Sequence, residues 1–398
     1  MSDHVDGPRS IGDPETDFTD VFGLTNLRNP VLARTGPSAT DGEIAAINLE
    51  SARRRAWAHF AEDTRRPGAA ETVVERERLA AQFLGDLNAL DRLDAIASQF
   101  ARVDHSFRAA LVHAEVASTM HRFDDARGHL AAAALMGGPP EAIERHSLTI
   151  DQACGVDLDA VLAARRRIAK TSGRPEDLAT LGAVLVDLQR FSEADAVYRQ
   201  AFYSFDDVSP FPLAWVCFQL GMLWGELASE PEPDLAALWY GRAIAYLPSY
   251  VRARVHLAEI FAGQGRLRDA EALLRRALGS GDPEVRWRLA DVLIAQERFA
   301  EAETQLEAAR AGFEALLERH LLAFADHAAE FYAGSGNVRH RALALARANV
   351  ANRPTRRAVT QLLAIEAQAN NATASSEQEE ACNAAASAAS VPNTGENQ

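Results

Sequence analysis

The sequence is short of cysteine and of the residues that favour strands. It has 3 cysteines in 398 residues, Cys154, Cys217 and Cys382, and no CxxC pair. This spacing gives no disulfide framework and fits a reducing compartment. Aromatic residues make up 7% of the chain, and runs of Val, Ile and Thr are almost absent. Because alanine, a strong helix former, supplies much of the apolar content, we expect an all-α protein.

Long apolar runs are also missing. No run of about 18 apolar residues occurs, so the sequence predicts no membrane span. The first residues, MSDHVDGPRSIGDPETD, are acidic and lack the apolar segment of a secretory signal. We therefore expect a cytoplasmic protein that does not bind membranes.

Positive charge is scarce. The chain has 41 Lys and Arg against 56 Asp and Glu, a net charge of −15. Residues 1–20 contribute −5 and residues 371–398 contribute −4, which leaves −6 for residues 21–370. A protein that binds nucleic acid through its phosphates needs a basic surface. The acidic body therefore predicts that no nucleic acid is a partner.

Motifs that carry catalysis are absent as well. The sequence has no glycine-rich phosphate loop, no GxSxG and no HExxH. Gly334-Ser335-Gly336 lies between two expected helices, where it is typical of a turn. We predict no enzyme activity and no cofactor, and assign no catalytic or metal-binding residue.

Histidines are the nearest approach to a metal motif. His105, His113, His121 and His129 recur every eight residues, but eight residues on one helix fall about 80° out of register. Imidazoles on different faces cannot share an ion, so the simpler interpretation is that they are core or solvated residues. A weaker candidate is His327 with Glu330, three residues apart, and His320 seven residues before His327.

What the sequence does contain is internal repetition, clearest over residues 254–309. Two copies of one pattern of large and small apolar residues lie 32 residues apart. The first copy has Leu257, Ala258, Phe261, Ala270, Leu274 and Ala277, and the second has Leu289, Ala290, Leu293, Ala302, Leu306 and Ala309. This spacing predicts two antiparallel helices per copy, with alanines where the helices approach closely.

A short phrase also recurs at the start of each expected second helix. It reads Arg, a large apolar residue, a variable residue, an acid and Ala, and it begins at Arg122, Arg190, Arg266 and Arg298. The segments LGAVLVDLQRFSEADAVYRQA and LAEIFAGQGRLRDAEALLRRAL resemble the tetratricopeptide repeat (TPR) family. The resemblance is clear over residues 104–135 and 175–309 and weaker over 320–354. It implies a right-handed α-α superhelix of helix-turn-helix repeats.

Four regions follow from the pattern. Residues 1–40 are expected to be a disordered acidic N-terminus followed by an apolar extended arm at 21–38, which either docks on the first helices or lies in the protein's own groove. Residues 41–174 are expected to form a divergent helical region with degenerate TPR-like repeats. Residues 175–370 are expected to form the TPR array, ending in a capping helix at 355–369, and residues 371–398 a disordered tail.

The resemblance also implies a concave groove lined by the first helix of each repeat. Its positions lie three residues before and one after the small residue of each first helix, with Trp215 and Arg252 on the same side. The expected peptide-binding residues are Trp215, Phe218, Met222, Arg252, Val255, Glu259, Trp287 and Asp291. An alternative is that the aromatic residues among them belong to the core between repeats. The Lys and Asn residues with which co-chaperone members of the family bind acidic peptide C-termini are missing at these positions, so that role is not expected.

The resemblance therefore favours a non-enzymatic scaffold, assembly or accessory factor that binds another protein or a peptide in this groove. Two alternatives stay open. One is a peptide-sensing regulator, which requires residues 41–101 to bind DNA. The other is a metal-dependent or enzymatic factor that uses the histidine-rich helical region.

Overall fold

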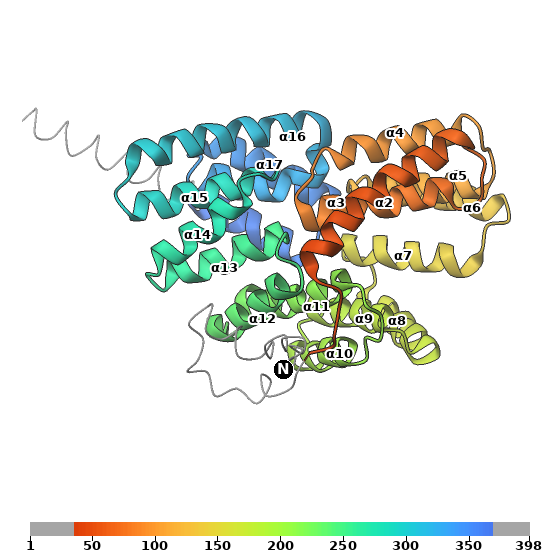
Figure 1. The fold of residues 1–398 in the computed structure, drawn as a ribbon, viewed down its shortest axis with the longest axis horizontal. Helices are drawn as coiled ribbons and strands as arrows, with labels where there is room; N and C mark the ends of the chain where they lie inside the picture. Colours follow the sequence, from red (N-terminus) through yellow and green to blue (C-terminus); the bar gives the residue numbers. More distant parts are fainter. Residues whose placement is uncertain (1–35, 369–398) are drawn as a thin grey trace, which may run out of the picture. The chain divides into compact units, whose positions relative to one another are not determined.

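The computed structural model describes residues 36–368, and all regular secondary structure in that range is helical (Figure 1). The described chain begins with α2 (Gly42–Glu62), α3 (Ala69–Leu84), α4 (Ala89–Ala101), α5 (Phe107–Thr119), α6 (Phe123–Leu135), α7 (Pro140–Cys154) and α8 (Leu158–Ser172). The expectations for the N-terminus, for most of the 21–38 arm and for the 371–398 tail lie outside the described residues.

The repeats continue the chain. They are α9 (Pro175–Asp187), α10 (Phe191–Tyr203), α11 (Pro210–Met222), the π-helix η1 (Leu223–Leu227), α12 (Pro233–Tyr246), α13 (Val251–Gly263), α14 (Leu267–Ala277), α15 (Pro283–Ala295), α16 (Phe299–Ala333) and α17 (Arg339–Asn352). A last helical stretch covers 356–368. Successive helices pack as pairs, α5 with α6, α9 with α10, α11 with α12 and α13 with α14. The prediction of an all-α solenoid of TPR-like helix pairs is confirmed.

The described chain divides into two compact units. Unit 1 holds residues 36–152 and 156–312, and unit 2 holds residues 153–155 and 313–368. Inside unit 2, α16 breaks at His320 (φ −138°, ψ 47°), so two helices meet there, where the sequence predicts the end of one helix and the start of a weaker repeat. Phe313 and Phe331 stack across these two helices with ring centroids 5.0 Å apart.

The recurring arginine closes the turn between the two helices of a repeat. It stands just before the second helix, and in three of the four copies its guanidinium reaches the acid three residues later, whereas Arg122 bonds Asp94 instead. Arg190 Nε lies 2.6 Å from Glu193 Oε1, Arg266 Nε lies 2.8 Å from Asp269 Oδ2, and Arg298 Nε lies 2.7 Å from Glu301 Oε1. Each acid also lies in the first turn of its helix, where the helix dipole favours negative charge.

The residue before this arginine is always left-handed. His121, Gln189, Gly265 and Glu297 have φ values of 55°, 59°, 76° and 61°. Only one of the four is glycine, although an L side chain in this conformation costs about 1–2 kcal/mol. The turn geometry, rather than the identity of this residue, is what the repeats share.

Small residues on the first helices have a matching reason. A Cβ added to Gly221 would lie 2.5 Å from the Tyr240 ring, and one added to Gly182 would lie 2.7 Å from the Tyr198 ring. In both repeats, a tyrosine of the second helix lies flat against the backbone of the first helix. Glycine is therefore required by close approach in these two helices.

The N-terminal helices of unit 1 pack back onto its later repeats. The Phe83 ring of α3 lies 5.2 Å from Phe211 and 4.8 Å from Tyr250, centroid to centroid. Just after α3, the Gly85 carbonyl accepts a hydrogen bond of 3.0 Å from Gly281 N–H. We call this set of contacts the closing contact, because it joins α3 to the beginnings of α11 and α13 and to the turn before α15.

The segment before α2 is also held. The Tyr246 hydroxyl donates a 2.9 Å hydrogen bond to the Pro37 carbonyl, and Thr40 N–H donates one of 2.8 Å to the Val208 carbonyl.

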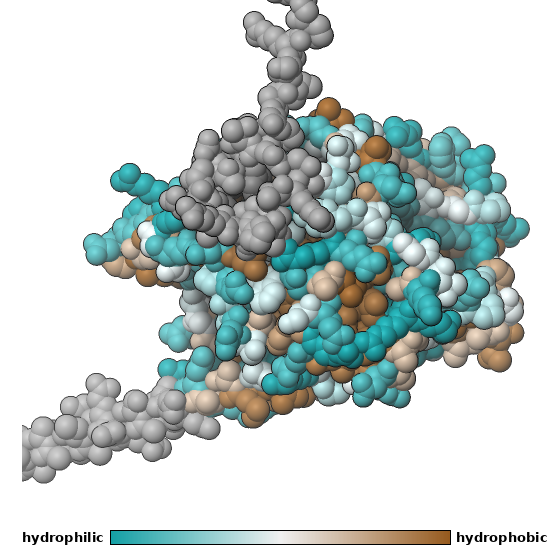
Figure 2. Space-filling view, turned by 90° about the horizontal axis from the view of Figure 1, so that it is seen from below, coloured by the Kyte–Doolittle hydropathy of each residue, from teal (hydrophilic) through white to brown (hydrophobic). Residues whose placement is uncertain are grey.

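On the face drawn in Figure 2, hydrophilic residues cover much of the described surface, and apolar areas show between them. Among the described residues, no helix has the length and apolarity needed to cross a membrane.

Replacing Glu297 by glycine is expected to stabilise the protein. Glu297 is exposed, and glycine relieves the left-handed strain at the expense of a more flexible unfolded chain, so the net gain is about 0.5–1 kcal/mol. Gly265→Ala, at the equivalent position with nothing near the added Cβ, should lose a similar amount. Urea denaturation measures both, and a Glu297→Gly midpoint at or below that of the wild type would contradict the prediction.

Gly221→Ala is expected to destabilise the protein by about 1–3 kcal/mol, because the methyl group overlaps the buried Tyr240 ring. The matched control is Gly263→Ala near the end of α13, where no atom lies within 4 Å of the new Cβ. The control should be neutral or stabilising, since alanine favours helix. Equal unfolding midpoints for the two variants would show that the tyrosine does not require the glycine.

Candidate functional site

The predicted binding residues lie on the first helices of three successive repeats in unit 1. Trp215, Phe218 and Met222 are on α11, and Arg252, Val255 and Glu259 are on α13. Trp287 and Asp291 are on α15, which packs beside α13. The register derived from the repeats therefore brings all eight residues to neighbouring helices.

Burial divides the eight residues into two sets. Phe218, Met222, Val255 and Trp287 are buried, with at most 6% of each exposed. Trp215, Arg252, Glu259 and Asp291 are partly exposed. We call the surface formed by these last four the first-helix face. Its role in binding stays a prediction.

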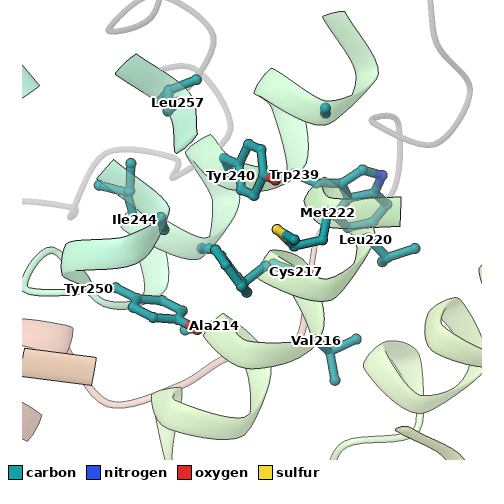
Figure 3. Packing of buried hydrophobic residues seen from close by; sticks show 14 of the residues in the cluster. Ala214, Val216, Cys217, Leu220, Met222, Trp239, Tyr240, Ile244, Tyr250 and Leu257 are labelled. Atoms are coloured by element: carbon teal, nitrogen blue, oxygen red, sulfur yellow. The ribbon is translucent and has the colours of Figure 1, made fainter. Parts of the chain in front are cut away.

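Aromatic rings pack against one another in the core of these repeats, and Figure 3 shows Tyr240 and Tyr250 among them. Tyr250 packs on Phe218 with ring centroids 5.2 Å apart, and Phe218 packs on Tyr240 at 5.6 Å. The Tyr240 ring then stacks on the His256 imidazole at 5.5 Å with an angle of 17° between the planes. Burial raises the pKa of Tyr250 and raises that of the nearby Cys217 thiol to about 12. These groups therefore stay neutral near neutral pH and act as core.

Beside these rings lies a polar cluster that the sequence reasoning missed. Glu226, His256 and Glu259 bring one ligand atom each to within 4.8 Å of one another. His256 Nδ1 lies 2.6 Å from Glu226 Oε1 and 3.2 Å from Glu259 Oε2. We call these three residues the carboxylate–histidine cluster.

Two local features build this cluster. On α13, Arg252, His256 and Glu259 are four and three residues apart, so they share one helix face. Glu226 comes from the π-helix that follows α11, in which Ala228 N–H bonds the Leu223 carbonyl five residues back at 2.8 Å. Single π-turns are rare and occur often at functional sites. The extra residue in this turn sets where Glu226 projects.

The charges of the cluster are balanced by its neighbours. Burial disfavours the imidazolium of His256, but the carboxylates of Glu226 and Glu259 outweigh burial and raise its pKa to about 10. Arg288 Nε lies 2.7 Å from Glu259 Oε1, and its guanidinium carbon lies 3.6 Å from the centre of the Trp287 ring. Two carboxylates thus face an imidazole and a guanidinium on a platform of buried rings.

Part of this cluster had a signal in the sequence. Gln219, His256 and Arg288 each stand two residues before the small residue of a first helix, so a polar residue recurs at this position in three repeats. The register singled out the positions three before and one after, and passed over this one. No such signal exists for Glu226, because the repeat pattern assumes an α-helical turn where the chain forms a π-helix.

Two of the four regularly spaced histidines lie together in the structure. His113 on α5 and His129 on α6 stack with centroids 4.8 Å apart, because antiparallel packing of two helices brings them together. Burial lowers the pKa of both histidines. The positive charges of His129 and Arg122 lower the pKa of His113 further, against the carboxylate of Asp94. For His129, Asp125 opposes burial and Arg122 lowers the pKa further. Among the described residues, the metal-ligand grouping found is the carboxylate–histidine cluster, which includes neither histidine of this pair.

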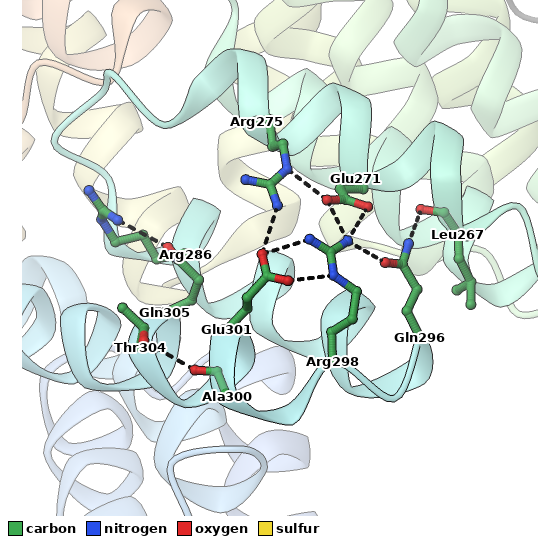
Figure 4. A network of polar contacts seen from close by, with 10 residues as sticks. All are labelled: Leu267, Glu271, Arg275, Arg286, Gln296, Arg298, Ala300, Glu301, Thr304 and Gln305. Atoms are coloured by element: carbon green, nitrogen blue, oxygen red, sulfur yellow. Dashed lines mark hydrogen bonds and ion pairs between the residues drawn. The ribbon is translucent and has the colours of Figure 1, made fainter.

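A second polar network joins the turns of two repeats (Figure 4). Arg298 bonds Glu271 on α14 at 2.8 Å and Glu301 on α16 at 2.6 Å, and Arg275 bonds Glu271 at 2.7 Å. Burial raises the pKa of Glu271, but these guanidiniums outweigh it and lower the pKa overall. An open pocket of about 700 Å³ lies beside this network. The network's arginines, Arg275 and Arg298, are bound by carboxylates. The network therefore links two repeats and offers little positive charge to an anion.

Three solved structures are similar to this chain at low sequence identity. For a chain of the APC/C hetero-tetramer Cut9-Hcn1, the identity is 13% and the TM-score 0.46, covering 77% of this chain and 58% of that chain. For the C-terminal part of a TPR repeat-containing protein from Cytophaga hutchinsonii, the identity is 14% and the TM-score 0.31, covering 74% of this chain and 98% of that chain. For the apo form of RapI, the identity is 13% and the TM-score 0.31, covering 79% of this chain and 99% of that chain. No protein-family model and no curated protein matches the chain.

The stacked histidines predict a loss of stability in acid. Their pKa values are lowered in the folded protein, so between about pH 6.5 and those lower values the unfolded chain binds more protons. The free energy of unfolding should therefore fall as the pH drops below about 6.5, by at most about 1.4 kcal/mol per pH unit for each histidine. His129→Gln should flatten this dependence, whereas His59→Gln, exposed on α2, should leave it unchanged. Denaturation profiles that are parallel in all three proteins would contradict the assignment.

Proposed function

We propose that this protein is a non-enzymatic scaffold that binds a segment of another protein on the first-helix face of α11, α13 and α15. The observation that carries the proposal is the division of burial on this face. Phe218, Val255 and Trp287 are held in the core, and they support the partly exposed Trp215 and the charged side chains around it. A partner that docks there meets side chains mounted on rigid helices, which lowers the ordering cost of binding.

The chemistry of the face suggests the chemistry of the partner. Trp215 offers a large apolar surface, and tryptophan is among the residues that most often dominate binding energy. Asp291 and Glu259 carry negative charge beside Arg288, which lies 3.9 and 2.7 Å from them, and Arg252, whose guanidinium carbon lies 5.5 Å from the centre of the Phe218 ring, carries positive charge. A peptide with an apolar anchor between a basic and an acidic residue fits this arrangement.

The regulator alternative receives less support. It requires a DNA-binding surface within residues 41–101, which hold α2, α3 and α4. There Arg53 and Arg92 are bound by Asp86 at 2.7 and 2.6 Å, and Arg92 also by the buried Glu77 at 2.8 Å. These guanidiniums are neutralised inside the helical region.

The proposal can be tested with a displayed library of random peptides selected on the folded protein. The dissociation constant of a selected peptide is then measured by fluorescence anisotropy against three variants, Trp215→Ala, Arg252→Glu and Asp291→Lys. Trp215→Ala should weaken binding about thirtyfold or more, which corresponds to about 2 kcal/mol. The two charge reversals should each weaken it by about tenfold.

Glu303→Lys is the matched control, because Glu303 is an exposed acid on α16, the second helix of its repeat. Circular dichroism establishes that each variant keeps the helical fold. Binding that survives all three variants but is lost in Glu303→Lys would place the binding surface elsewhere, and failure to select any peptide would count against a peptide partner.

A further inference from the structure

We propose that the carboxylate–histidine cluster of Glu226, His256 and Glu259 is a binding site for a divalent transition-metal ion such as Zn²⁺. Imidazole nitrogen with two carboxylate oxygens is a donor set that suits such ions, and three protein ligands leave a fourth position for water or a partner group. The proposal does not depend on the proposed function: it shares Glu259 with the first-helix face, but its test measures metal and not a peptide.

The distances come close to those of a bound ion. Two donors that each lie about 2.1 Å from one ion are roughly 3–3.5 Å apart, and never more than about 4.2 Å. His256 Nδ1 lies 2.6 and 3.2 Å from the two carboxylate oxygens, and the three ligand atoms fit within 4.8 Å. For an ion to bind, the exposed Glu226 carboxylate must turn until the three atoms surround it.

The histidine is oriented as a ligand rather than as a surface residue. Only 8% of His256 is exposed, and its ring is held between Tyr240, stacked at 5.5 Å, and the edge of Phe218 at 5.4 Å. These contacts fix the direction of Nδ1 toward Glu226 and Glu259. A fixed imidazole loses little rotational freedom when an ion binds.

The two oxygens of the Glu259 carboxylate face different partners. Its Oε1 receives Arg288 Nε at 2.7 Å, while its Oε2 faces His256. Second-shell contacts of this kind orient a ligating carboxylate and leave one oxygen for the metal. Because Arg288 also stacks on Trp287, the orientation is anchored in the core.

Tyr240 supplies an independent observation. Only 1% of this residue is exposed, and its hydroxyl has no hydrogen-bond partner among the described residues. A Cβ placed on Gly225, which precedes Glu226 in the π-helix, would lie 3.6 Å from that hydroxyl. A buried hydroxyl without a partner is costly, and the water shell or ligand of an ion beside Glu226 would satisfy it.

The test measures Zn²⁺ directly on the untagged full chain. After dialysis against excess Zn²⁺ and then a metal-free buffer at about pH 8, the bound metal is counted by mass spectrometry; the ion has to displace the proton that the two carboxylates favour on His256. Affinity is measured by titration calorimetry. One Zn²⁺ per chain is expected, with Glu226→Gln, His256→Gln and Glu259→Gln each weakening binding at least tenfold.

His113→Gln is the control, because this histidine is also half-buried but belongs to the stacked pair on α5 and α6. It should leave the affinity unchanged. Since Glu226 is exposed, Glu226→Gln should keep the fold even where substitution of His256 does not. Anomalous diffraction at the zinc edge then locates the ion. Absence of stoichiometric Zn²⁺, equal affinity in Glu226→Gln and the wild type, or an ion found away from Glu226 would overturn the proposal.

Discussion

The contact between Tyr240 and Gly221 is the one on which the middle of unit 1 depends. It sets how closely α11 and α12 approach, since the ring lies where a Cβ would be. The same ring also stacks on His256 of the next repeat. One side chain therefore joins the packing inside a repeat to the packing between repeats. The position of the carboxylate–histidine cluster follows from this arrangement.

Most of the fold could be predicted from the sequence, because its causes are local and repeated. Apolar spacing places the helices, and the phrase that begins at Arg190, Arg266 and Arg298 marks each second helix through an arginine–acid pair inside one turn. Alanine and glycine mark the close approaches. Each of these rules acts within a few residues, so a single sequence records it.

The candidate site was less accessible to the same reasoning. The register placed Phe218 and Trp287 on the right helices, but it could not tell which side of the first helix is covered by the neighbouring repeat, and both residues are buried. His256 was missed although a polar residue recurs at its position. Glu226 could not be placed, because a π-helix is decided by the packing of α11 on α12 rather than by a pattern of residue types.

The closing contact changes what kind of folding unit the repeats make. A simple solenoid is held together only by neighbouring repeats, so it can unravel from either end one repeat at a time. Phe83 and Gly85 are bound instead to Tyr250 and Gly281, residues far along the chain. Forming that contact closes a long loop, which slows folding. Once the contact is formed, unfolding of the N-terminal helices also removes contacts from repeats that are distant in sequence. Unit 1 therefore gains the cooperativity of a globular domain.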